Sequence, residues 1–183
     1  MPLSNAAPVR GRSQARGNAE RTGRMVDMKK RIAAVCAALM LAVPVQAQAM
    51  ADSEVYALAE EIGGAYGICP ELLQAIAWHE IRYEENASNG GCEGLMQVSE
   101  KWHRDRMKEL GVTDLYDPRQ NMTVAADYLA ELFEEYGEPG MVLMKYNGDS
   151  TSVARYGKLG YGMSEYAEGV LQMSAQMERE HGK

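Results

Sequence analysis

The sequence has few of the residues that most often bind transition metals, with three Cys and three His among its 183 residues. None of them follows the spacing of zinc ligands, so no metal centre is expected. Long hydrophobic runs are also missing. The longest, Ile32 to Val45, has about 14 residues, whereas a helix that crosses a bilayer needs roughly 20. We therefore expect no permanent membrane anchor.

Charge is distributed unevenly along the chain. Residues 1–49 contain eight Lys or Arg and two acidic residues, whereas residues 50–183 contain 11 basic and 24 acidic residues. The second part has no Lys/Arg cluster with interleaved aromatic residues, and its net negative charge repels phosphate groups. Nucleic acid is therefore excluded as a partner.

The basic N-terminal part has the pattern of a secretory signal. Three basic residues, Lys29 to Arg31, precede the apolar run, and Ala47-Gln48-Ala49 has the small-x-small form of a cleavage site. We expect residues 28–49 to be a signal peptide that is cleaved near Ala49, and the mature protein to be secreted into the cell envelope, in the periplasm or cell wall. Residues 1–27 are expected to be a disordered or upstream-start extension outside the fold.

Cysteine use agrees with export. Cys36 lies in the apolar run, so the mature part retains only Cys69 and Cys92. An even pair in an oxidising compartment predicts a disulfide, with two reduced thiols as the alternative.

Residues 51–180 have the periodicity of a single all-α domain, without a convincing strand. Caps, prolines and terminal glycines predict helices, and polar Gly-rich sequence predicts loops over 84–93 and 147–162. The predicted helices are 53–66, 70–83, 99–110, 118–136, 141–146 and 164–177.

Glu80 is an acidic residue on an apolar helix face. Leu73, Ile76 and Ala77 precede it by seven, four and three residues, which places all four on one side of the helix. A carboxyl group among apolar side chains has a raised pKa, which suits a general acid. His79 is adjacent but turned by about 100° around the helix, so we do not expect it to assist Glu80.

Four segments share an order and spacing with a known family. They are Glu80, Gly94-Leu95-Met96-Gln97, Asp117-Pro118 with Asn121, and Tyr146-Asn147-Gly148. This arrangement resembles the soluble lytic transglycosylase family, or transglycosylase SLT domain, which has a lysozyme-like fold. The resemblance extends from Tyr66 to about Val170.

The resemblance implies that Glu80 is the catalytic acid/base that cleaves the β-1,4 bond between N-acetylmuramic acid and N-acetylglucosamine in peptidoglycan. It implies a 1,6-anhydro product and no cofactor. One departure is Ile81, which stands where the family usually has Ser. The implied substrate-binding residues are Met96, Gln97, Tyr146, Asn147 and Tyr166, and the implied structural residues are Gly94 and Asn121.

Two other functions stay open at this point. One is a lysozyme-type muramidase, in which water and a loop acid such as Glu84, Glu85, Glu93 or Asp149 complete the hydrolysis. The other is a glycan-binding or assembly module of a secretion or conjugation apparatus. Trp78 and Trp102 could stack on sugar rings, although packing is the more common role of a helical Trp.

Overall fold

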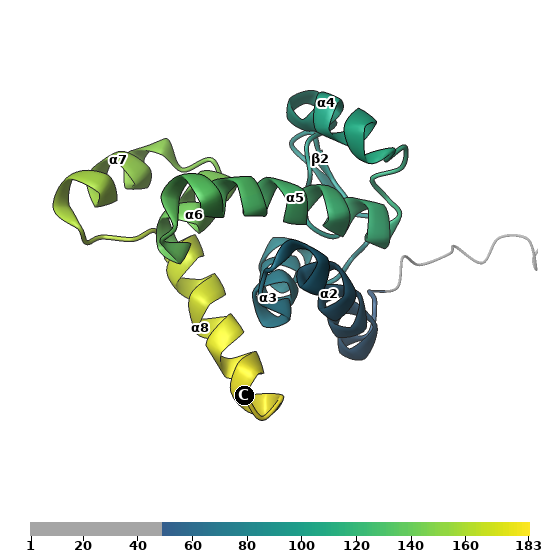
Figure 1. The fold of residues 1–183 in the computed structure, drawn as a ribbon, viewed down its shortest axis with the longest axis horizontal. Coiled ribbons are helices and arrows are strands. Elements are labelled where there is room, and N and C mark those ends of the chain that lie inside the picture. The colour runs from purple at the N-terminus through teal and green to yellow at the C-terminus, as the bar shows by residue number, and fades with distance from the viewer. Residues whose placement is uncertain (1–48) are drawn as a thin grey trace, which may run out of the picture. The chain divides into compact units, whose positions relative to one another are not determined.

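The computed structural model describes residues 49–183, so the predicted extension 1–27 and the signal peptide up to residue 48 lie outside the described residues. The described part is helical apart from two short paired strands (Figure 1), which confirms the all-α prediction. None of its helices combines the length and apolarity that a membrane span requires. The helices are α2 (Asp52–Tyr66), α3 (Pro70–Ile81), α4 (Glu100–Leu110), α5 (Pro118–Tyr136), α6 (Pro139–Tyr146), α7 (Ser150–Leu159) and α8 (Glu165–Glu180).

Local capping explains where several helices begin. The Asp117 carboxylate accepts a hydrogen bond from the Gln120 amide, and Pro118 occupies the first position of α5. The Ser164 hydroxyl accepts a hydrogen bond from the Ala167 amide at the start of α8. These two starts agree with the sequence prediction.

Two loop predictions were wrong. The segment 147–162 contains α7, because the Asp149 carboxylate caps the Ser152 amide at 2.9 Å and Gly160 ends the helix in the left-handed region. Within 84–93, the strands β1 (Ser88–Asn89) and β2 (Cys92–Glu93) pair antiparallel. Gly90 and Gly91 form the two-residue turn between these strands. Both have positive φ, which this kind of turn requires.

The central helix is α3, which contacts both α2 and α8. Figure 1 shows α2 and α3 on one side of the long α5, with α8 descending from α6. The predicted apolar face of α3 is buried, since Leu73, Ile76 and Ala77 have no exposed surface. Burial of this face fixes the direction of the Glu80 side chain.

A buried carboxylate joins the first turn of α3 to the end of the chain. Glu71 is fully buried, and it accepts hydrogen bonds from Tyr56 and Cys69. Its Oε1 lies 2.9 Å from His181 Nδ1 and 2.8 Å from Lys183 Nζ. Burial alone raises the pKa of Glu71, but the bonds from Lys183, His181 and Cys69 outweigh it and lower the pKa to about 2.

Glu71→Gln is expected to lower the free energy of unfolding near neutral pH by roughly 2 kcal/mol, as for hydrogen bonds to charged groups. The pKa of Glu71 is about 2 in the folded protein and 4.5 ordinarily. Its stabilisation is therefore present above about pH 4.5 and is lost as the pH falls toward 2. Denaturant unfolding across this pH range measures the difference, with Glu168→Gln at an exposed position of α8 as the control. A difference that stays constant with pH would contradict this role.

Candidate active site

Glu80 lies in the last turn of α3, half-buried, at the wall of a cavity of about 830 Å³. The other walls come from the loop that contains β2, from α4 and α5, and from the end of α6. Gln97, Tyr146 and Asn147 line the same cavity. Three of the five predicted substrate-binding residues therefore line the cavity with Glu80.

The surroundings of Glu80 act on its protonation in opposite directions. Burial raises the pKa of Glu80 above its usual 4.5, and a hydrogen bond from Tyr166 lowers it in part. The Tyr166 hydroxyl on α8 donates to Glu80 Oε1 at 2.6 Å. Since burial is the larger effect, the protonated form of Glu80 is favoured relative to an exposed glutamate.

Tyr146 is the second phenol near Glu80. Its hydroxyl donates a hydrogen bond to the Met96 carbonyl at 2.7 Å, which ties the end of α6 to the loop before α4. Burial raises the pKa of Tyr146 well above its ordinary value, and the charge of Glu80 raises it further. Tyr146 is therefore a neutral hydrogen-bonding group at neutral pH.

The loop from Gly94 to Gln97 is held in place by one buried amide. The Asn121 side chain accepts from the Met96 amide and donates to the carbonyls of Glu93 and Leu115, each at 2.7 Å. Gly94 has φ +72°, and a Cβ at this position would lie 2.0 Å from the Leu115 carbonyl oxygen. These contacts give a physical reason for Gly and Asn at positions 94 and 121.

The prediction for Met96 needs correction. Its side chain has no exposed surface and does not line the cavity, because it belongs to the core that α5 covers. Its backbone amide and carbonyl instead hold Asn121 and Tyr146 in place. Gln97 does line the cavity, with its amide nitrogen donating to the carbonyls of Ala87 and Gly94.

The predicted disulfide is not formed, and Cys69 and Cys92 are both free thiols. Cys69 precedes α3, where its Sγ lies 3.1 Å from the Glu71 carboxylate. Cys92 lines the cavity with Glu80, near the opposite end of α3. Residues 69 and 80 are about 16 Å apart along a helix, whereas disulfide-bonded Cα atoms lie within roughly 7 Å.

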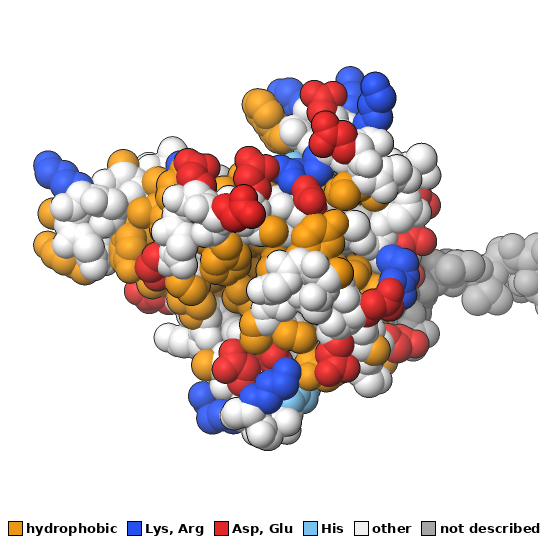
Figure 2. Space-filling model, viewed as in Figure 1, with side chains coloured by type: hydrophobic (Ala, Val, Ile, Leu, Met, Phe, Trp, Pro, Cys, Tyr) orange, Lys and Arg blue, Asp and Glu red, His pale blue; other side chains and the backbone are white. Residues whose placement is uncertain are grey.

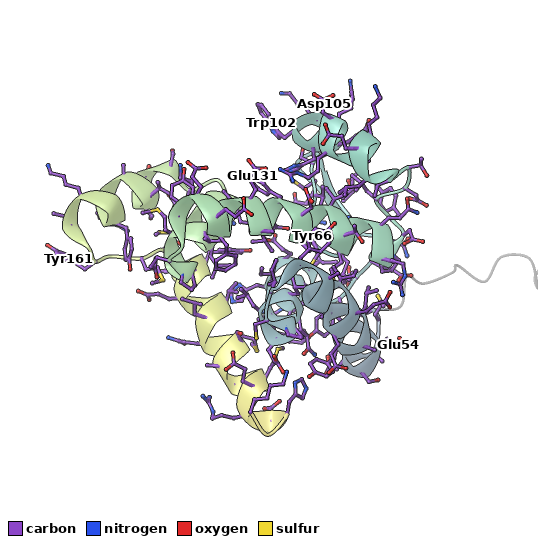
Figure 3. All side chains as sticks on the ribbon, in the orientation of Figure 1. Glu54, Tyr66, Trp102, Asp105, Glu131 and Tyr161 are labelled. Atoms are coloured by element: carbon purple, nitrogen blue, oxygen red, sulfur yellow. The ribbon has the colours of Figure 1, made fainter. Side chains whose placement is uncertain are left out.

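Charged residues on the far wall were not predicted from the sequence. Asp105 and Glu109 on α4 and Glu131 on α5 line the cavity, and Figure 3 shows Asp105 and Glu131 on these two helices. Arg106 pairs with both Asp127 and Glu131. The polar face of the predicted helix 99–110 could have indicated these acids. A polar face is, however, equally typical of a helix that faces solvent.

The predicted loop acids Glu84, Glu85, Glu93 and Asp149 do not line the cavity. Ile81 does not line it either and lies partly buried against the core. His79 stacks edge-on to Tyr166, with ring centres 5.6 Å apart, so it supports the residue that bonds to Glu80. Within residues 49–183, no cluster of Cys, His, Asp or Glu has the arrangement of a metal site.

The sequence is similar to a known family and to several known proteins. The sequence model described as "Transglycosylase SLT domain" matches residues 57–167. A "Transglycosylase" of Enterobacteria phage PRD1 is 34% identical over 102 residues, 54% of this chain and 37% of that protein. An "X polypeptide" of Escherichia coli is 36% identical over 93 residues, 46% of this chain and 54% of that protein.

Solved structures show similarity in fold. An inactive mutant of the lytic transglycosylase Slt from Pseudomonas aeruginosa superposes with a TM-score of 0.60 at 18% identity, over 69% of this chain and 24% of that chain. The 70 kDa soluble lytic transglycosylase Slt70 of Escherichia coli gives a TM-score of 0.59, also at 18% identity, with the same coverage. The chain thus spans about half or less of the relatives described here.

Asn121→Asp is expected to destabilise the protein by roughly 3 kcal/mol, because a buried carboxylate oxygen would replace the amide nitrogen that donates to the carbonyls of Glu93 and Leu115. Denaturant unfolding measures this loss. Asn147→Asp is the matched control at an exposed amide, where the change should stay within about 0.5 kcal/mol. Equal stability of the two variants would show that the Asn121 hydrogen bonds do not hold this loop.

Proposed function

The chain belongs to the transglycosylase SLT domain family, and from this premise we propose that it is a peptidoglycan lytic transglycosylase with Glu80 as its single acid/base. The observation that carries the proposal is the half-buried carboxyl group of Glu80, raised in pKa, at the wall of a cavity large enough for part of a glycan strand. Cavities of roughly 300 to 1,000 Å³ are typical of ligand sites.

The proposed reaction uses one carboxyl group twice. Protonated Glu80 donates its proton to the glycosidic oxygen between N-acetylmuramic acid and N-acetylglucosamine, and the bond to the anomeric carbon breaks. The Glu80 carboxylate then takes the proton of the 6-hydroxyl group of the same muramic acid, whose oxygen bonds to the anomeric carbon. The products are a 1,6-anhydro sugar and a free N-acetylglucosamine end, and Glu80 is protonated again.

An internal nucleophile removes the need for a second carboxylate. The 6-hydroxyl group is already attached to the reacting sugar, so its effective concentration at the anomeric carbon is high. The Tyr166 hydrogen bond supports the carboxylate that forms after the first proton transfer. Gln97 and Asn147 offer amide groups to the sugar from the cavity wall.

We further propose that the substrate is reached in the cell envelope after cleavage of residues 28–49. The net negative charge of residues 50–183 argues against a nucleic-acid substrate, and the name of one relative supports a cell-wall substrate. One relative is called "Membrane-bound lytic murein transglycosylase F", from Desulfosudis oleivorans, at 33% identity over 86 residues, 45% of this chain and 18% of that protein. A role beside a secretion or conjugation apparatus is compatible with the same chemistry.

Purified peptidoglycan digested by this protein is expected to yield anhydro ends, which are lighter by one water than reducing ends in mass spectrometry. Glu80→Gln should reduce this release by roughly 100-fold or more, because it removes the proton donor. Glu84→Gln, at an exposed loop acid, is the control and should keep full activity.

Two other outcomes of this digestion would contradict the proposal. Ordinary reducing ends would identify a muramidase, and the cavity acids Asp105 and Glu109 would then be the candidates for activating water. Wall binding by the wild type without any release would identify a glycan-binding module.

Tyr166→Phe is expected to shift the alkaline limb of the pH profile of kcat/KM upward. Loss of the hydrogen bond removes the contact that lowers the pKa of Glu80, so the acid form persists to higher pH. Rates on soluble glycan strands across pH measure this shift. Tyr161→Phe, at an exposed tyrosine away from the cavity, is the control. A limb that stays in place or moves down would show that Tyr166 does not act on Glu80.

A further inference from the structure

Trp102 is exposed at the edge of the Glu80 cavity and takes no part in the core. It lies in the first turn of α4 and keeps 76% of its surface exposed. The other large hydrophobic residues exposed in residues 49–183 are Tyr116, Leu159 and Tyr161, and none of these lines this cavity. Exposure together with position distinguishes Trp102 from an ordinary surface aromatic.

Trp102 and its neighbour His103 have different surroundings. The His103 ring packs against the Tyr128 ring of α5 with centres 4.7 Å apart, and the backbone at His103 is non-helical, with φ −114° and ψ 16°. Trp102 keeps most of its surface exposed, so its side chain projects into solvent while the next side chain along the chain packs onto α5. Figure 3 places Trp102 at the free edge of α4, and Figure 2 shows a hydrophobic side chain there among charged ones.

The indole ring has one face available. The Lys101 ammonium group lies 4.7 Å from the ring centre and covers one face. The negative π-face of an aromatic ring attracts the weakly positive C–H groups on the flat side of a pyranose. Asp105 and Glu109 line the same cavity from α4, where their carboxylates can accept hydrogen bonds from sugar hydroxyl groups.

We propose that Trp102 is a stacking platform for one sugar ring of the glycan strand, at a position away from the bond on which Glu80 acts. The choice of ligand rests on the proposed function. Trp102 strengthens binding of strands long enough to reach both Glu80 and α4, and it leaves the chemistry at Glu80 unchanged. It therefore sets a preference for strand length.

Binding tests this role without relying on catalysis. The chain has two Trp residues, so Trp78→Phe in a Glu80→Gln background leaves Trp102 as the only indole in a protein that does not cleave the probe. Peptidoglycan glycan strands freed of stem peptides and sorted by length are the probe. Long strands should shift the Trp102 emission to the blue and protect it from acrylamide quenching, and disaccharide units should do neither. Unchanged emission at saturating long strands would overturn the proposal.

Substitution separates stacking from general hydrophobicity. In a Glu80→Gln background, where turnover is blocked, Trp102→Ala and Trp102→Leu should each weaken long-strand binding roughly tenfold, and Trp102→Phe should retain most of it. Tyr161→Ala removes an aromatic that is 67% exposed away from the cavity, and it should have no effect. Equal loss for Phe and Ala would contradict a stacking role.

Kinetics distinguish this inference from the proposed function. Trp102→Ala should raise KM for long strands with the same kcat and the same pH profile. Unchanged KM together with normal anhydro release would reject the platform and keep the enzyme. Strand binding that depends on Trp102, without release by the wild type, would keep the platform and reject the enzyme.

Discussion

Dehydration of the Glu80 carboxyl group is the constraint on which the rest of the site depends. The side chain is half-buried because α3 buries its apolar face between α2 and α8, and Glu80 continues that face at the end of the helix. A charged carboxylate loses hydration there, so the neutral form is favoured. Packing of an entire helix, rather than a single partner, therefore sets the acidity of this group.

One hydrogen bond to Glu80 offsets part of this cost, and other hydrogen bonds hold the surrounding wall in place. Tyr166 approaches Glu80 from α8, and Tyr146 approaches from α6 while bonded to the Met96 carbonyl. Asn121 on α5 holds the loop to which Met96 belongs. The cavity wall thus consists of segments far apart in sequence, and each is fixed by a contact to a neighbour rather than by its own propensity. The fully buried Glu71 anchors the other end of the same helix α3.

Much of this arrangement could be predicted from the sequence, because local signals determine it. The periodicity around Glu80 and the Asp117-Pro118 cap predicted α3 and α5 correctly. The interior position of Met96, the separation of Cys69 from Cys92 and the acids on α4 could not be predicted, since each depends on how helices approach one another. The helix α7 was hidden by a Gly- and Ser-rich composition, although the Asp149 cap that starts it is visible in the sequence. The family resemblance implied a role for Tyr166 in the site, and the structure shows its hydrogen bond to Glu80.

The protonation of Glu80 can be measured directly. Carbon-13 NMR of the glutamate side-chain carboxyl groups, titrated with pH, follows each group separately, and the signal missing in Glu80→Gln identifies Glu80. This group is expected to titrate above the ordinary glutamate value of 4.5. A Glu80 carboxyl group that titrates at or below 4.5 would show that burial does not control its acidity.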